Sequence, residues 1–233
     1  MRLEFVLGDE VEDFASRFEA EVAGPREAAW RLTPADARPP LAILCSREDH
    51  CLLDLLLRLR SGELRAELVT VVSTVPEHAT QVEALGVRYE HLPVADGGMP
   101  EHEHRLLELL AGRIELLVLA RYMRVLSGEF LARVGAPAIN IHHSFLPAFA
   151  GAAPYARAHE RGVKLIGATA HYVTEELDAG PIIEQETVRV SHRDGVEDLQ
   201  RKGRDIERVV LARAVHAHLE DRVARWGERT VVF

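Results

Sequence analysis

Hydrophobic residues in the middle of the chain form short runs that alternate with longer amphipathic stretches. The runs predict strands, at residues 41–45, 67–73, 87–94, 115–120 and 137–142. The intervening stretches predict helices, at residues 49–60, 78–85, 101–110 and 127–134, the last of them capped by Ser127. Strands that alternate with helices are typical of βαβ crossovers, and they predict a parallel sheet covered on both faces.

The pattern changes after residue 163. Residues 164–173 and 181–190 predict two more strands joined by a polar loop, and residues 196–223 predict one long helix with apolar positions at helical spacing. Pro147 and Pro154 predict a loop after the strand at 137–142. The fold class is therefore α/β with a doubly wound, mostly parallel sheet, in which ligands bind beyond the carboxyl ends of the strands.

A proline-rich break at residues 34–40 predicts a linker. Before it, residues 2–7 predict a strand, residues 10–22 a helix and residues 29–32 a short strand. A segment of this size buries too little apolar surface to fold alone. We therefore expect it to pack against the rest of the chain or against another protomer, and we expect a homo-oligomer.

Composition narrows the possible partners. The chain has 233 residues, 47% of them hydrophobic, and its 37 acidic and 28 basic residues give a formal net charge of −9. Such a chain is an ordinary globular protein without the basic field that attracts nucleic acid or an anionic membrane. It has no apolar run of membrane-spanning length, no signal-peptide pattern, and too few cysteines, Cys45 and Cys51, for a disulfide framework. We therefore expect a cytoplasmic protein with no nucleic-acid or membrane partner.

Two polar side chains mark the end of the strand at 137–142. Alternation places Asn140 and His142 on the same side of that strand. An amide and an imidazole together form a donor pair suited to an oxyanion, and the imidazole titrates near neutral pH. The alternative is that His142 and His143 are only hydrogen-bonded polar residues that close the strand.

A second candidate is Asp178, in a D-A-G-P turn between the last two predicted strands. Its carboxylate either stabilises the turn by a local hydrogen bond or pairs with an imidazole, whose pKa it would raise. Together with His142, His143 and His171 it could also bind a metal. We expect no metal, because the chain lacks H-E-x-x-H and adjacent strand residues point to opposite faces.

Four long segments resemble the formyltetrahydrofolate deformylases, which are hydrolases related to the folate-dependent formyltransferases. These segments are residues 44–52, 119–127, 139–185 and 196–223, and the resemblance extends over residues 41–233. It implies a formyltransferase-like, Rossmann-type hydrolase domain. It also implies hydrolysis of 10-formyltetrahydrofolate to formate and tetrahydrofolate, which balances one-carbon pools and supplies formate for purine synthesis, with no metal and no cofactor beyond the folate substrate.

The resemblance also implies roles for individual residues. Asn140 and His142 would donate to the oxyanion, with His142 passing a proton to the departing nitrogen, and Asp178 would orient both His142 and the attacking water or accept the water's proton. The remaining residues implied to bind substrate are His171, Met123, Arg124, Val125, Leu126, His143, Ala179 and Gly180.

Water is the expected formyl acceptor. Residues 45–50 lack glycine and contain two acids, so they form a poor phosphate cradle for a ribonucleotide amine, and His143 replaces a proline of the transferases. Two alternatives stay open: a formyltransferase with another amine acceptor, and a folate-binding module without turnover.

The chain departs from this family at two places. Residues 1–33 resemble only the second half of an ACT domain, a ferredoxin-like α+β unit, so we expect no regulation by a small amino acid through a complete ACT site. Ala153 replaces a lysine or arginine beside the pocket mouth.

Overall fold

The computed structural model describes residues 2–6, 11–94, 97–147 and 154–233. The chain divides into two compact units, Met1–Ala37 and Arg38–Phe233. Ala153, where the sequence departs from the pattern of its family, lies outside the described residues.

Among the described residues, the larger unit is built on a seven-stranded sheet with the order β3-β2-β1-β4-β5-β6-β7. Its strands are β1 (Pro40–Cys45), β2 (Glu67–Ser73), β3 (Tyr89–His91), β4 (Leu116–Ala120), β5 (Ala138–His142), β6 (Leu165–Tyr172) and β7 (Ile182–Arg189). The first five are parallel, whereas β6 is antiparallel to β5 and β7 to β6. The predicted mostly parallel sheet is confirmed, with the strand predicted at 87–94 shortened to three residues.

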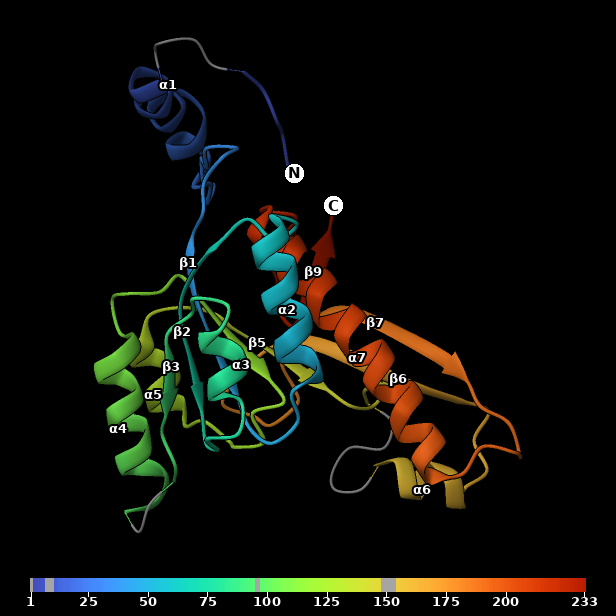
Figure 1. Ribbon diagram of the computed structural model, residues 1–233. Helices are drawn as coiled ribbons and strands as arrows, with labels where there is room; N and C mark the ends of the chain where they lie inside the picture. Colours follow the sequence, from blue (N-terminus) through green and yellow to red (C-terminus); the bar gives the residue numbers. More distant parts are fainter. Residues whose placement is uncertain (1, 7–10, 95–96, 148–153) are drawn as a thin grey trace. The chain divides into compact units, whose positions relative to one another are not determined.

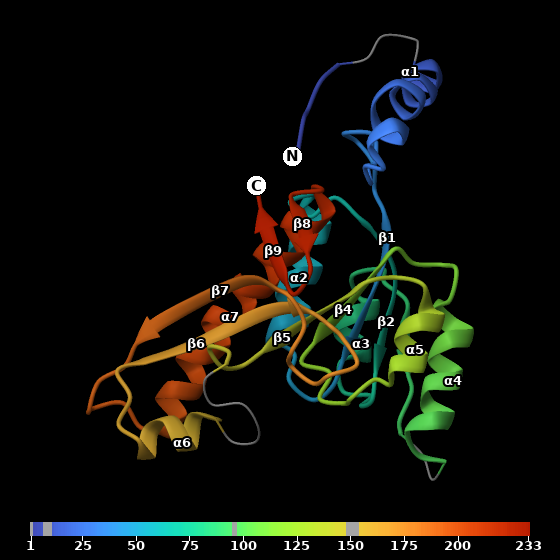
Figure 2. The ribbon, with the colours of Figure 1, turned by 180° about the vertical axis from the view of Figure 1, so that it is seen from behind.

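Helices cover both faces of this sheet (Figures 1 and 2). One face packs against α2 (His50–Ser61), α3 (Ala79–Glu83) and α7 (Val196–Leu219), and the other against α4 (Gly98–Leu110) and α5 (Gly128–Val134). In β1, Leu41 and Ile43 contribute to the first core while Ala42 and Leu44 contribute to the second. An uninterrupted apolar run is therefore what a strand buried on both faces requires.

Local signals fix the ends of α5. Ser127 precedes the helix, and its Oγ accepts a hydrogen bond from the backbone N–H of Phe130 at 3.1 Å, which confirms the predicted serine cap. Gly135 ends the helix with a left-handed φ of +71°, a conformation that glycine adopts without steric cost.

Two predictions about the second half of the chain were wrong. The loop predicted around Pro154 instead contains α6 (Pro154–Glu160), because a proline's fixed φ suits the first position of a helix. The long helix ends at Leu219 rather than at residue 223, and the hairpin β8 (Val223–Trp226) and β9 (Arg229–Val232) follows. Asp221 has a left-handed φ of +51°, which redirects the chain.

The smaller unit contains α1 (Val11–Phe18), which continues into a π-helical turn at Glu19–Ala23 and a 3-10 turn at Gly24–Arg26. Aromatic contacts hold it, with ring centroids of Phe18 and Trp30 4.8 Å apart. The strands predicted at 2–7 and 29–32 were wrong over their described residues, which form no strand because no segment of this unit pairs with them. Leu7 and Glu10 lie outside the described residues.

Within the described residues, no helix has both the length and the apolar character that crossing a lipid bilayer demands.

Candidate active site

The antiparallel pairing of β5 and β6 brings the first site residues together. Asn140 of β5 lies opposite His171 of β6 in the strand register, and His142 is the last residue of β5. His142 and His171 are buried, and Asn140 is partly buried. The side-chain alternation predicted for Asn140 and His142 therefore directs an amide and an imidazole toward one polar cluster.

His142 is oriented by Asp178, which lies in the loop between β6 and β7. Nδ1 of His142 is 3.2 Å from Oδ2 of Asp178, and because a carboxylate only accepts hydrogen bonds, Nδ1 carries a proton. Nε2 of His142 is buried and has no hydrogen-bond partner among the described residues. That atom is therefore left to interact with a substrate or a water molecule.

The backbone around Asp178 is closely constrained. Asp178 adopts a left-handed φ of +57°, a conformation that aspartate tolerates better than most residues. Two residues later, a Cβ at Gly180 would lie 1.8 Å from the carbonyl oxygen of Tyr172, so only glycine fits at position 180. These two positions direct the Asp178 carboxylate back to β5.

A hydrogen bond from His142 stabilises the charged form of Asp178. This bond is the largest effect on the Asp178 carboxyl, and it holds the pKa of that carboxyl well below its usual range, against the opposing effect of burial. The nearest atoms of Asp178 and His171, Oδ1 and Nε2, are 3.7 Å apart. Asp178 is therefore an anion at neutral pH and a weak base.

His171 and Asn140 complete the cluster. Nδ1 of His171 donates to the carbonyl oxygen of Tyr172 at 2.9 Å, so the neutral ring has its lone pair on Nε2. Nδ2 of Asn140 lies 3.3 Å from that Nε2 and donates one of its two hydrogens to it. The second amide hydrogen of Asn140 stays available for an oxyanion.

Six of the residues predicted to bind folate lie on two loops, Met123, Arg124, Val125 and Leu126 on one and Ala179 and Gly180 on the other. Met123, Arg124 and Val125 are exposed in the loop after β4, whereas the side chain of Leu126 is buried in the core. In the loop after β6, Ala179 is exposed and Gly180 is buried. The two loops are adjacent. Gly128 begins α5 directly after the β4 loop, and a Cβ there would lie 2.9 Å from Cδ of Glu175 in the β6 loop.

His143 belongs to a different environment from His142. Its Nδ1 lies 2.5 Å from Nη1 of Arg121, whereas the Nδ1 of His142 faces Asp178. Burial, followed by the positive charge of Arg121, lowers the pKa of His143 to about 4. His143 is therefore a neutral imidazole at physiological pH.

Sequence reasoning missed a buried group of polar residues behind this site. Glu207 of α7 is 1% exposed, and its carboxylate contacts Nε2 of His50 at 2.8 Å and the hydroxyl of Tyr155 at 2.6 Å. Burial alone would raise the pKa of Glu207, but these contacts and Arg121 lower it to about 2. One signal could have identified the group, because Glu207 interrupts the apolar stripe of α7 between Gly203 and Leu211.

The chemistry of two clusters bears on metal binding. His50, Cys51 and Glu207 have potential ligand atoms within 4.8 Å of one another. Both oxygens of Glu207 are already hydrogen-bonded, and the guanidinium of Arg121 is 3.5 Å away, so the donor set suits an internal ion network better than a cation. The same guanidinium faces His143, which makes the predicted alternative of a metal held by His142 and His143 unfavourable.

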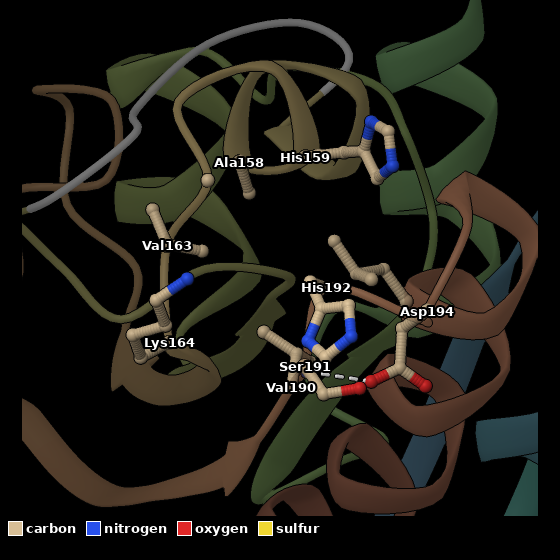
Figure 3. Close-up of a pocket in the computed structure, with 10 residues that line it drawn as sticks. Ala158, His159, Val163, Lys164, Val190, Ser191, His192 and Asp194 are labelled. Carbon is tan, nitrogen blue, oxygen red and sulfur yellow. Dashed lines mark hydrogen bonds between the residues drawn. The ribbon is translucent and has the colours of Figure 1, made fainter.

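A surface pocket of about 230 Å³ lies elsewhere, between α6 and the start of α7 (Figure 3). Lys164, His159 and His192 line it together with apolar side chains. Its carboxylate, Asp194, is bonded to Lys202 at 2.9 Å and to the backbone N–H of Ser191 at 2.6 Å. This pocket contains none of the four residues that meet around Asp178.

Known proteins resemble the chain over most of its length. Residues 40–215 match the protein family described as formyl transferase. The chain is 53% identical over 223 residues to the formyltetrahydrofolate deformylase of Mycobacterium tuberculosis, which covers 96% of this chain and 72% of that protein.

Solved structures extend the comparison. A formyltetrahydrofolate deformylase from Pseudomonas syringae pv. tomato is similar with a TM-score of 0.92 and 45% identity, covering 97% of this chain and 76% of that one. The glycinamide ribonucleotide transformylase 1 of Symbiobacterium toebii is similar with a TM-score of 0.78 and 29% identity, covering 88% of this chain and 98% of that one.

Proposed function

The chain belongs to the formyl transferase family and, within it, to the formyltetrahydrofolate deformylases, which hydrolyse 10-formyltetrahydrofolate to formate and tetrahydrofolate, and we propose that Asn140, His142 and Asp178 carry out this reaction. The observation on which the proposal rests is the contact between Asp178 and Nδ1 of His142, which leaves the buried Nε2 of His142 free.

Water attack is the first step. Nε2 of His142 takes a proton from water as the water oxygen forms a bond to the formyl carbon, and the carbonyl π electrons move to the formyl oxygen. The Asp178 carboxylate stabilises the resulting imidazolium. Sequence reasoning allowed Asp178 itself to accept the proton, but a carboxyl with so low a pKa is a poorer base than the imidazole.

Collapse of the tetrahedral intermediate is the second step. The free amide hydrogen of Asn140 donates to the oxyanion, an interaction that contributes roughly 10²–10³ in rate at comparable sites. The oxyanion electrons re-form the carbonyl, the carbon–nitrogen bond breaks, and Nε2 of His142 returns its proton to the departing nitrogen. The products are tetrahydrofolate and formic acid, which loses its proton to solvent and becomes formate.

Substrate binding is assigned to the two adjacent loops. Exposed Met123 and Val125 offer apolar contacts for the folate ring, and the backbone at Ala179 and Gly180 offers polar ones. We also assign Arg124, Leu126, His143 and His171 to the substrate-binding site. No group beyond the folate substrate is needed for the steps above, and we propose that the enzyme uses no metal or other cofactor.

One assay tests the function and both alternatives. The protein is incubated with 10-formyltetrahydrofolate alone, and formate and tetrahydrofolate are quantified. Hydrolysis predicts equal amounts of both products without an amine. Product release only after an amine is added would identify a formyltransferase, and tight folate binding without either product would identify a binding module.

The organisation of the chain forms part of the same proposal. We propose that residues 1–33 form a partial ACT-like segment, that residues 34–40 are a linker, and that residues 41–233 form the hydrolase domain. We further propose that the protein is a cytoplasmic homo-oligomer.

A further inference from the structure

A buried polar chain leads from α7 to the reaction site. Helix α7 runs past α2 and α6 (Figure 1). Glu207 of α7 contacts His50 of α2 and Tyr155 of α6. A carboxylate so deeply buried loses its hydration and is destabilising unless it is paired. The contact between Tyr155 and Glu207 requires a glycine at position 203, because a Cβ there would lie 1.9 Å from the Tyr155 hydroxyl.

Arg121 is the next member of this chain. It follows β4 with a left-handed φ of +63°, and its side chain is only 12% exposed. Its Nε lies 3.5 Å from Oε2 of Glu207, and its Nη1 lies 2.5 Å from Nδ1 of His143. Because a guanidinium only donates hydrogen bonds, Nδ1 of His143 accepts, and the proton of the neutral ring is on Nε2.

His143 in turn packs against His142. The two rings are stacked, with centroids 5.2 Å apart and planes inclined by 21°. A positive charge on His143 would therefore oppose the imidazolium that forms on His142 during the reaction. Among the described residues, the charged or titratable groups that face His143 are Arg121, His142, Tyr155, Asp178 and Glu207.

We propose that Glu207 and Arg121 are positioning residues, which hold His143 in one uncharged tautomer against His142 so that His142 alone carries the proton of hydrolysis. This inference rests on the proposed function of His142. We name the connected residues Glu207, Arg121 and His143 the polar relay. Neither Glu207 nor Arg121 contacts the Asp178 carboxylate, so they act on the reaction through His143.

The first experiment replaces the middle of the polar relay. Arg121→Met should lower kcat at pH 5.5 at least about fivefold relative to wild type while KM changes less than about threefold, because the guanidinium that keeps His143 uncharged is lost and most His143 rings are then protonated. The acid limb of the kcat profile should move upward by at least about one pH unit, as His143 approaches the ordinary histidine pKa of about 6.5. Arg133→Met is the matched control, since Arg133 is an exposed arginine paired with Glu129 on α5.

A double-mutant cycle asks whether Arg121 acts through His143. In a His143→Asn background, Arg121→Met should lower kcat by less than about twofold. Losses that multiply in the double variant would overturn the proposal, as would an Arg121→Met enzyme with the wild-type pH profile. Glu207→Gln preserves the side-chain shape but removes a negative charge that raises the pKa of His143, so it should not move the acid limb upward. Arg121→Gln covers the case in which Arg121→Met does not fold.

Nitrogen-15 NMR of the histidine rings tests the polar relay without turnover. In the wild-type protein His143 should keep a proton on Nε2 and none on Nδ1 from pH 8 to pH 5, and in Arg121→Met it should titrate in that range. Wild-type protein without hydrolysis would refute the proposed function but leave this readout intact. Active wild-type protein in which His143 titrates near pH 6.5 would refute the relay alone.

Discussion

Asp178 Oδ2 lies 3.2 Å from His142 Nδ1, which fixes the imidazole with its other nitrogen, Nε2, buried and unpaired among the described residues. The low pKa of Asp178 shows how strongly the site favours a carboxylate there. A fixed charge beside one ring nitrogen determines which chemistry the other can perform, because it stabilises the ring when Nε2 accepts a proton.

Removing any of three side chains should stop most turnover. Asn140→Ala, His142→Ala and Asp178→Asn should each lower kcat at least about a hundredfold, because each removes an interaction made in the transition state. Asparagine is chosen at 178 because it tolerates the left-handed backbone. Formate release measures the effect, with circular dichroism as the control for folding. Near wild-type turnover in His142→Ala would refute the mechanism.

Replacing Gly180 should disturb the loop that carries Asp178. Gly180→Ala places a Cβ 1.8 Å from the Tyr172 carbonyl oxygen, so the loop must shift. We expect a loss of about 1–3 kcal/mol in the free energy of unfolding, together with a lower kcat. Gly195→Ala is the control, because the nearest atom to its Cβ, on Asp198, is 3.9 Å away. Urea unfolding and formate release give the two readouts, and equal behaviour of the two variants would contradict the steric argument.

Acid should weaken the contribution of Glu207. Its pKa falls from 4.5 to about 2 on folding, so its stabilising effect is complete above about pH 4.5 and is lost as the pH falls toward 2. The free energy of unfolding of Glu207→Gln should therefore depend less on pH between 5 and 3 than that of wild type, by on the order of 1 kcal/mol. Parallel curves from urea titrations at each pH would contradict this.

The predicted strands show why the sheet could be predicted from sequence. Residues 41–45 and 116–120 are uninterrupted apolar runs because β1 and β4 are buried on both faces, and such runs are the direct consequence of a central parallel sheet. α6 was missed because Pro154 signals a loop as readily as a first helical residue. The pairing of β8 and β9 depends on a turn near Gly227 that an amphipathic period does not reveal.

The site was predictable only in part. Alternation was enough to place Asn140 and His142 on one side of β5, but the approach of Asp178 was implied only by resemblance to a family, since turn residues carry no distance information. Arg121 and Glu207 meet through tertiary packing alone. From the sequence alone, Arg121 is a residue that follows a strand and Glu207 is an acid on a helix. Nothing in these positions predicts that the two side chains meet.

A chelator should leave activity unchanged. The proposed steps use only side chains and water, so overnight dialysis against EDTA should alter kcat by less than about twofold, with formate release as the measurement. An activity that disappears on dialysis and returns with added zinc would instead identify a metal enzyme.

The N-terminal unit should contribute to assembly. Leu3 is 69% and Phe5 48% exposed, and a segment of this size cannot offset the entropy of ordering from its own contacts. We expect light scattering to show an oligomer for the full chain and a smaller species for a chain that begins at Arg38. A monomer in both cases would contradict the prediction.

Position 178 has a consequence for how this enzyme can evolve. The left-handed φ of +57° admits glycine, asparagine and aspartate more readily than other residues, and of these three only aspartate carries a charge. The backbone conformation and the proposed proton transfer therefore each restrict which amino acid can occupy position 178, for independent reasons. Drift at this position is confined to a few side chains that preserve the loop. Under the proposed mechanism, a lineage that accepts either of the two neutral ones keeps the fold and loses the reaction.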